Sequence, residues 1–160
     1  MKINFLRTIL LILLLGTFFI IFGFSNQDAE ESGNLSSSIA KFILKQMHHD
    51  DIENKEQILE RIESIIRKLA HFSIYTLVGF LLMSLISTYN LEENKRIIAS
   101  LCIGILYATS DEIHQLFIPG RSGQITDVIL DSMGVLLGIL LVLTALEIYK
   151  KIKRKMDVKE

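Results

Sequence analysis

The sequence predicts an all-α integral membrane protein, built as a bundle of four transmembrane helices. Half of the residues are hydrophobic, and they are concentrated in four blocks that are each long enough to cross a bilayer. The short stretches between these blocks are rich in charged and turn-forming residues. A soluble domain would instead spread its apolar residues periodically along amphipathic elements. We therefore assign residues 1–150 to one membrane domain and residues 151–160 to a basic cytoplasmic tail.

The first block, residues 5–24, predicts an uncleaved membrane anchor. A helix of this length extends about 30 Å, which matches the hydrocarbon core of a bilayer. Lys2 and Arg7 lie at its start. A cleavable signal peptide is the alternative, but the block is long for a signal-peptide core, and no small-x-small cleavage site follows it.

Residues 25–67 predict a polar outer loop that contains one or two amphipathic surface helices. Apolar residues recur at helical spacing in two segments of this loop. The first segment contains Leu35, Ile39, Phe42 and Ile43, and the second contains Ile58, Leu59, Ile62, Ile65 and Ile66. Such helices lie on the membrane surface or against the bundle. For the first segment, a solvated loop with partial helicity is an equal alternative.

The remaining blocks predict three further spans, at residues 69–88, 97–117 and 126–149. The third span is apolar as far as Tyr107 and polar after it. A Pro-Gly-Arg-Ser-Gly turn then leads to the fourth span. Within the fourth span, Gly134 and Gly138 have the spacing that allows two helices to approach closely.

The distribution of lysine and arginine predicts a plasma-membrane protein with both termini in the cytoplasm. Basic residues occur within 2–7, 95–96 and 150–155, and four spans place all three segments on one side. Short flanking segments rich in lysine and arginine face the cytoplasm. The 25–67 loop is more acidic than basic and is therefore expected to face outward.

This topology brings polar residues from four separate segments to one depth near the outer surface. They are Ser25 and Gln27 after the first span, Lys68 and His71 at the start of the second, residues 111–115 at the end of the third, and Asp127 at the start of the fourth. Ionisable residues inside a membrane protein are functional candidates by default. The convergence of four segments strengthens that expectation.

Helical spacing groups these polar residues further. Lys68, His71 and Tyr75 share one helical face, and Asp111, His114 and Gln115 share another. Asp127 and Asp131 also share a face, and Asp131 lies about one turn deeper, where a carboxylate needs a partner. Two alternatives stay open: Glu112 is offset from its neighbours and could face lipid headgroups, and Asp111 could serve only in a salt bridge with Lys68 or Arg121.

The mixture of imidazole, carboxylate and cationic groups fits acid–base chemistry on an anionic ligand, or binding of one. Histidine titrates near neutral pH, and lysine and arginine hold phosphate or carboxylate groups. The catalytic candidates are His71, Asp111, Glu112 and His114. The ligand-binding candidates are Ser25, Gln27, Lys68, Tyr75, Gln115, Arg121, Asp127 and Asp131.

Several other classes of function are disfavoured. A net charge of −1 argues against a nucleic-acid binder, and a single cysteine, Cys102, forms no internal disulfide. His71 and His114 could hold a metal together with the carboxylates. However, no His-x-x-x-His motif or cysteine pair supports a metal site, and we expect no metal or other cofactor.

The assembled motifs resemble the VanZ family of small bacterial membrane proteins. They are Phe24-Ser25-x-Gln27, Lys68-x-x-His71-Phe72-x-x-Tyr75, and Ser110-Asp111-Glu112-x-His114-Gln115-x-Phe117-x-Pro119-Gly120-Arg121, followed by Asp127, Asp131 and Gly134. The resemblance extends from about Phe5 to Tyr149. One departure is Ser132, where an Asn often precedes the glycine.

The resemblance implies a cell-envelope protein with a link to low-level glycopeptide (teicoplanin) resistance. From the convergence of polar groups on the outer side and the cations at its rim, we expect the polar pocket to bind or modify an amphiphilic, phosphorylated lipid or cell-wall precursor at the outer leaflet. In a non-enzymatic alternative, the polar cluster is a structural or ligand-binding network. The protein then limits the access of lipoglycopeptides or assists another envelope enzyme. The expected partners are membrane lipid and a lipid-linked or glycopeptide ligand.

Overall fold

The computed structural model describes residues 2–46 and 55–157, and these form five helices. They are α1 (Lys2–Ser25), α2 (Ala29–Gln46), α3 (Lys55–Ile86), α4 (Glu93–Gln115) and α5 (Ile125–Asp157). All except α2 are long and apolar enough to cross a membrane. The predicted all-α fold with four spans is therefore confirmed. Part of the predicted outer loop, 47–54, and the end of the tail, 158–160, lie outside the described residues.

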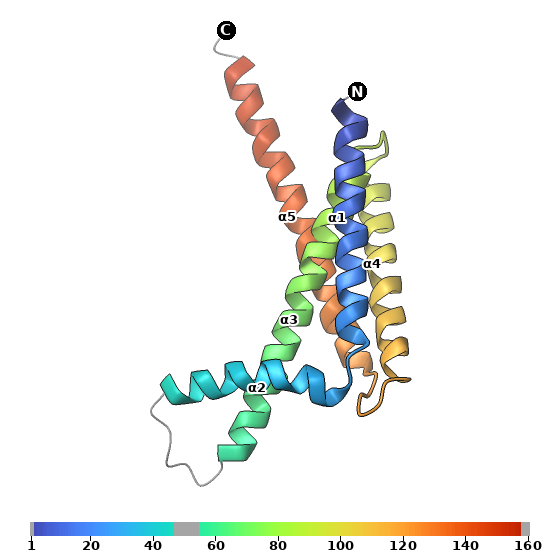
Figure 1. Cartoon of the computed structure of the whole chain (residues 1–160). Coiled ribbons are helices and arrows are strands. Elements are labelled where there is room, and N and C mark those ends of the chain that lie inside the picture. The colour runs from blue at the N-terminus through green and yellow to red at the C-terminus, as the bar shows by residue number, and fades with distance from the viewer. Residues whose placement is uncertain (1, 47–54, 158–160) are drawn as a thin grey trace.

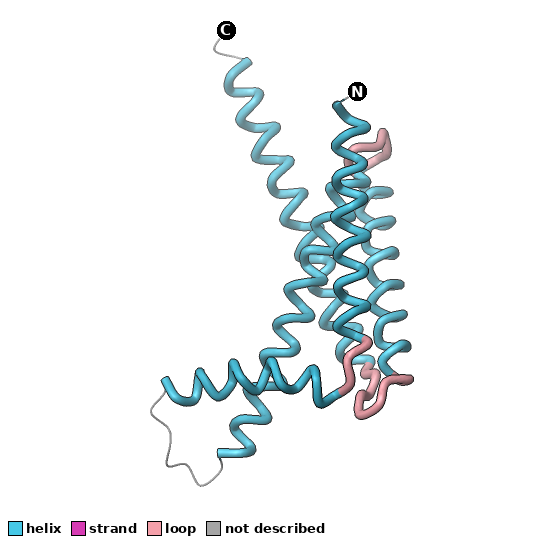
Figure 2. Tube along the Cα trace, viewed as in Figure 1, coloured by secondary structure: helices cyan, strands magenta, loops and turns pink. Residues whose placement is uncertain are grey.

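The four long helices run along the bundle, whereas α2 runs across one end of it (Figure 1). Both termini lie at the opposite end, where the loop between α3 and α4 lies next to the N-terminus (Figure 2). The connection from α1 to α2 and the turn from α4 to α5 lie together at the α2 end. The chain thus presents one end rich in polar turns and another that carries both termini.

The second amphipathic segment is not a separate helix, because α3 continues without interruption from Lys55 through the second span. The first glycine in α3 is Gly79 and the helix contains no proline, so nothing in its first half favours a helix end. For the same reason α5 continues past the predicted end of the fourth span to Asp157. A helix as long as α5 extends about 50 Å, well beyond the hydrocarbon core.

The first amphipathic segment forms α2, so the helical alternative is confirmed over a solvated loop. Ala40 and Leu44 are buried, and α2 packs against α3. Phe42 on its other side is 63% exposed. The side chain of Leu35 lies outside the described residues. An amphipathic helix that crosses the end of a bundle with an apolar side uncovered has the arrangement of a membrane-surface helix.

The closest helix contact joins α3 to α5 through three glycines. A Cβ atom placed at Gly138 would lie 2.1 Å from the Thr76 carbonyl oxygen, and one at Gly79 would lie 2.1 Å from the Val135 carbonyl oxygen. At Gly134 the nearest atom would be the Phe72 carbonyl oxygen, at 2.6 Å. Glycine is therefore required here, and the predicted packing role of Gly134 and Gly138 is confirmed.

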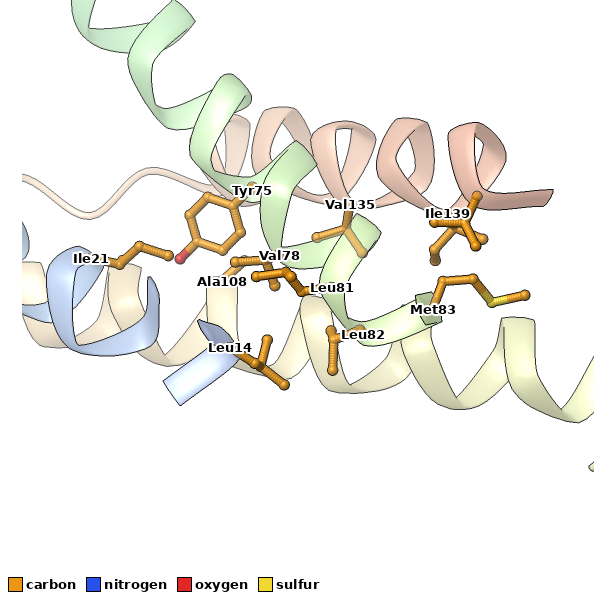
Figure 3. Close-up of a cluster of buried hydrophobic side chains, with 11 residues drawn as sticks. Leu14, Ile21, Tyr75, Val78, Leu81, Leu82, Met83, Ala108, Val135 and Ile139 are labelled. Carbon is orange, nitrogen blue, oxygen red and sulfur yellow. The ribbon is translucent and has the colours of Figure 1, made fainter. Parts of the chain in front are cut away.

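A buried apolar core surrounds this contact. Tyr75, Val78 and Met83 of α3 are fully buried, as are Val135 and Ile139 of α5. Figure 3 shows these side chains beside Leu14 and Ile21 of α1 and Ala108 of α4. All four spans therefore contribute to one core. The hydroxyl of Tyr75 lies at one end of this cluster, where the polar residues begin.

The helix α1 is held to the rest of the bundle by polar contacts along its length. Arg7 donates hydrogen bonds to the hydroxyl and carbonyl oxygens of Thr88, at 3.0 and 2.6 Å. Tyr107 stacks on Phe18 and donates to its carbonyl oxygen at 2.6 Å. A carbonyl oxygen that accepts a second hydrogen bond in this way links two helices directly.

Candidate functional site

A tight turn connects α4 to α5 and sets the position of the polar residues on both. The amide of Arg121 donates to the carbonyl of Ile118 at 3.2 Å, with Pro119 and Gly120 between them. Gly120 has a φ angle of 76°, which favours glycine, and proline suits the preceding position of such a turn. The predicted Pro-Gly turn is therefore formed, and it brings the end of α4 beside the start of α5.

Glu112 lies inside this junction and does not face headgroups. Its side chain is buried and accepts a hydrogen bond from the Gln124 backbone amide at 2.9 Å. The Gln115 amide also donates to Glu112, at 3.3 Å. The amide of Gln124 immediately precedes α5, and a carboxylate is favoured at the start of a helix. The expectation that Glu112 could point outward is thus wrong, because the turn folds back over it.

Two matched pairs join α3 to α5. Lys68 lies 3.4 Å from Asp127, and His71 Nδ1 lies 3.6 Å from Asp131 Oδ2. Lys68 and His71 are three residues apart on α3, while Asp127 and Asp131 are four apart on α5, so successive helical turns face each other. The prediction that distant segments bring their charged and imidazole groups together is confirmed for these residues.

An inner cluster is formed by His71 and Tyr75 of α3, Asp131 of α5 and Asp111 of α4. The Tyr75 hydroxyl donates to Asp111 Oδ2 at 3.3 Å, and the Gln115 amide donates to the same oxygen at 3.4 Å. Asp111 therefore contacts a tyrosine and a glutamine, rather than Lys68 or Arg121 as the salt-bridge alternative required.

A pocket of about 490 Å³ opens beside the cluster, between α2, α3 and the α4–α5 turn. Seven of the candidate site residues line it: Gln27, Lys68, His71, Glu112, Gln115, Arg121 and Asp127. Tyr75 and Asp131 lie about one helical turn further along α3 and α5 than the lining residues His71 and Asp127. His71 therefore belongs both to the pocket wall and to the inner cluster.

Arg121 lies at the edge of this pocket. One of its terminal nitrogens donates to the carbonyl of Phe24 at 3.2 Å, which ties the turn to the end of α1. Partial burial lowers the pKa of Arg121 from its ordinary value, although an arginine side chain stays protonated in proteins. A guanidinium has five N–H donors, so this hydrogen bond uses only part of its capacity.

His114 and Ser25 are positioned apart from the inner cluster. The His114 ring stacks on Phe22 of α1, with ring centroids 4.9 Å apart. Residues three apart on a helix differ in direction by about 60°, which is enough to turn His114 toward α1 while Asp111 faces Tyr75. Ser25 is buried at the end of α1, with no hydrogen bond to its hydroxyl among the described residues.

Some contributors to the site were not identified from the sequence. Ser36 and Ile39 of α2 line the pocket, as does Ser64 of α3, and Gln124 binds Glu112 through its backbone amide. The amphipathic pattern of α2 indicated a helix but not the surface against which it would pack. The contribution of a backbone amide could not be predicted from the sequence, because every residue except proline has one.

Comparison with known proteins identifies the family of the chain. No curated protein and no solved structure matches it. A family model described as VanZ/LLP1 matches residues 9–146, a range that contains every candidate site residue. The chain belongs to the VanZ/LLP1 family.

Proposed function

We propose that the pocket binds the anionic headgroup of an amphiphilic envelope lipid or lipid-linked cell-wall precursor. The observation that carries this proposal is the composition of the pocket, whose walls combine cationic side chains with a large apolar surface. Ligand sites are typically mostly apolar with a few polar groups that fix orientation. A phosphorylated lipid has the matching combination of a charged head and an apolar chain.

The cationic side of the pocket consists of Arg67, Lys68 and Arg121. Lys68 is paired with Asp127 at 3.4 Å, but its side chain is 49% exposed, so the pair leaves it accessible. Arginine and lysine bind phosphate through charge-assisted hydrogen bonds. The carboxylate of Glu112 also borders the pocket, yet it is held by the start of α5. Its charge is therefore partly balanced without a ligand.

The apolar side of the pocket is formed by the surface helix α2 and by the spans α3 and α5. Ile39 comes from α2, Ile66 and Ile74 come from α3, and Leu130 comes from α5. Because α2 crosses the end of the bundle (Figure 1), a lipid chain can follow α3 into the bilayer while its headgroup stays beside Arg121.

We further propose that this pocket faces the outside of the cell and that both termini are cytoplasmic. The support is the clustering of basic flanks at the end that carries the termini, since lysine and arginine favour the cytoplasmic side. The test uses two single-cysteine variants in a Cys102→Ser background. Ser122→Cys places the cysteine in the α4–α5 turn, and Asn90→Cys places it in the α3–α4 loop. A membrane-impermeant maleimide should label the first and not the second in intact cells; the reverse pattern would show the opposite orientation.

Binding is tested with full-length protein in nanodiscs, using a polyprenyl phosphate and the uncharged polyprenol as probes. We expect the phosphate to bind more tightly. We also expect the double variant Arg67→Gln, Lys68→Gln to weaken its binding by about tenfold or more. Lys95→Gln, at the opposite end of the bundle, is the matched control and should bind normally. Equal affinity for both probes, or equal loss in the control, would contradict the proposal.

A turnover assay distinguishes an enzymatic from a non-enzymatic version of this function. In an enzymatic version, His71 is the acid or base, because it lines the pocket and its Nδ1 faces Asp131 Oδ2 at 3.6 Å. In the non-enzymatic version, the cluster supports binding alone, and teicoplanin resistance would arise from occupancy of the lipid. Release of inorganic phosphate that is lost in His71→Asn supports the first. Binding without product in the wild type supports the second.

A further inference from the structure

We propose that His71, Asp111 and Asp131 form a binding site for a divalent transition-metal ion, Mn²⁺ or Zn²⁺. The sequence contains no metal-binding motif, and the metal alternative considered for it combined His71 and His114 with the carboxylates. The structure keeps His71 and two of the carboxylates, from α3, α4 and α5, and leaves His114 out. This site shares His71 with the wall of the lipid-binding pocket, but its test does not depend on the lipid-binding proposal.

The geometry of the three side chains is that of a loosely assembled coordination shell. One ligand atom from each residue lies within 4.8 Å of the other two. Bonds of about 2.0 to 2.2 Å to nitrogen and oxygen place the ligand atoms of one ion about 3 to 4 Å apart. The 3.6 Å separation of His71 Nδ1 and Asp131 Oδ2 is within this range and is too long for a hydrogen bond.

Asp131 provides a second observation that favours a bound ion, because its 3.6 Å approach to His71 is not a hydrogen bond. Its side chain is fully buried, and neither carboxylate oxygen has a hydrogen-bond partner among the described residues. The buried Nδ1 of His71 also lacks one. A buried carboxylate is normally hydrogen-bonded, paired or bound to a metal. An oxygen pair and an imidazole nitrogen that face each other without hydrogen bonds are the donor atoms of such a site.

The local charge also favours a cation. Asp111, Glu112 and Asp131 are all buried at the same end of the bundle. The contacts of the nearby cations are with other groups, since Lys68 pairs with Asp127 and Arg121 donates to the Phe24 carbonyl rather than to Asp111 or Asp131. A divalent ion between Asp111 and Asp131 would balance both of their charges.

The donor set and its surroundings define the metal class. One imidazole with two carboxylates suits Mn²⁺ or Zn²⁺, whereas the absence of a thiolate at this site disfavours Cu⁺. Tyr75 and Gln115 donate to Asp111, and such outer hydrogen bonds orient metal ligands. Because His71 also lines the pocket, an ion can enter from that side.

The test uses chelator-stripped full-length protein in detergent, titrated with MnCl₂ or ZnCl₂ and followed by calorimetry and elemental analysis. We expect about one ion per chain. Outer-shell partners alone change metal affinity by about 10- to 100-fold, so Asp131→Asn and Asp111→Asn should each reduce affinity by about 100-fold or more. Glu147→Gln, which removes an exposed carboxylate from the same helix α5, is the matched control and should bind normally.

A folded wild-type protein that binds neither ion overturns the proposal and indicates that the carboxylates are balanced by protons. Binding that survives both Asp131→Asn and Asp111→Asn also overturns it. Electron spin-echo measurements on the wild-type Mn²⁺ complex provide a test that does not depend on variant folding. Nitrogen coupling from a directly bound imidazole is expected, and its absence refutes the assignment of His71.

Discussion

Replacing Gly138 with alanine should separate α3 from α5 and destabilise the protein. The new Cβ would lie 2.1 Å from the Thr76 carbonyl oxygen and 2.5 Å from the Phe80 amide nitrogen. Both are backbone atoms of a helix, which cannot rotate away as a side chain can. Restoring ordinary contact requires the helices to move apart by about 1.3 Å at this point.

We expect this change to cost about 2 to 3 kcal/mol of unfolding free energy, as overpacked core positions do. For a chain of this length, that corresponds to a fall in Tm of roughly 4 to 12 °C. Thermal unfolding followed by circular dichroism in detergent measures the shift. Gly16→Ala is the control, because a Cβ there meets nothing within 4 Å.

Gly16 and Gly138 differ in whether an added methyl group would meet another helix. Both substitutions add one methyl group to a helix of the same membrane domain, and alanine has the higher helix propensity by about 1 kcal/mol. Gly16→Ala should therefore leave Tm unchanged or raise it slightly. If Gly138→Ala unfolds at the same temperature as Gly16→Ala, the close packing of α3 on α5 does not exist as described.

Three smaller effects follow from other contacts. Gly120→Ala forces alanine to a φ of 76° and should destabilise by about 1 kcal/mol; an unchanged Tm would contradict the turn. Tyr107→Phe keeps the ring stack but loses the 2.6 Å hydrogen bond to Phe18, which should cost about 1 kcal/mol in the same assay. Lys68→Met breaks the partly exposed pair with Asp127 and should change stability by less than about 1 kcal/mol, while weakening lipid-phosphate binding in nanodiscs.

The number and order of the spans could be predicted because they depend on composition alone. A block of apolar residues long enough to cross a bilayer is visible without any knowledge of packing. The ends of the helices were less predictable. The start of α3 at Lys55 and the end of α5 at Asp157 lie in polar sequence, where hydropathy falls but nothing stops a helix.

The site was predictable within each helix but not between helices. Spacing correctly placed Asp127 with Asp131 and Lys68 with His71, because both relations follow from the helical repeat. It could not show which direction each helix faces in the bundle. That rotation is set by packing, and it decided that His114 contacts Phe22 instead of the inner cluster.

The same alignment of α3 with α5 produces both the glycine contacts and the polar contacts between these helices. The contacts Lys68–Asp127 and His71–Asp131 are followed along the same two helices by Phe72–Gly134 and Thr76–Gly138. Sliding α5 by one turn would move it about 5.4 Å and put one glycine in the place of the other, but it would also bring Leu130 or Val142 against the backbone of α3. The glycines therefore favour the alignment in which the acidic residues of α5 meet the basic and imidazole residues of α3. It follows that Gly138→Ala should weaken the binding of any ligand held by His71 and Asp131, although no polar residue has been changed.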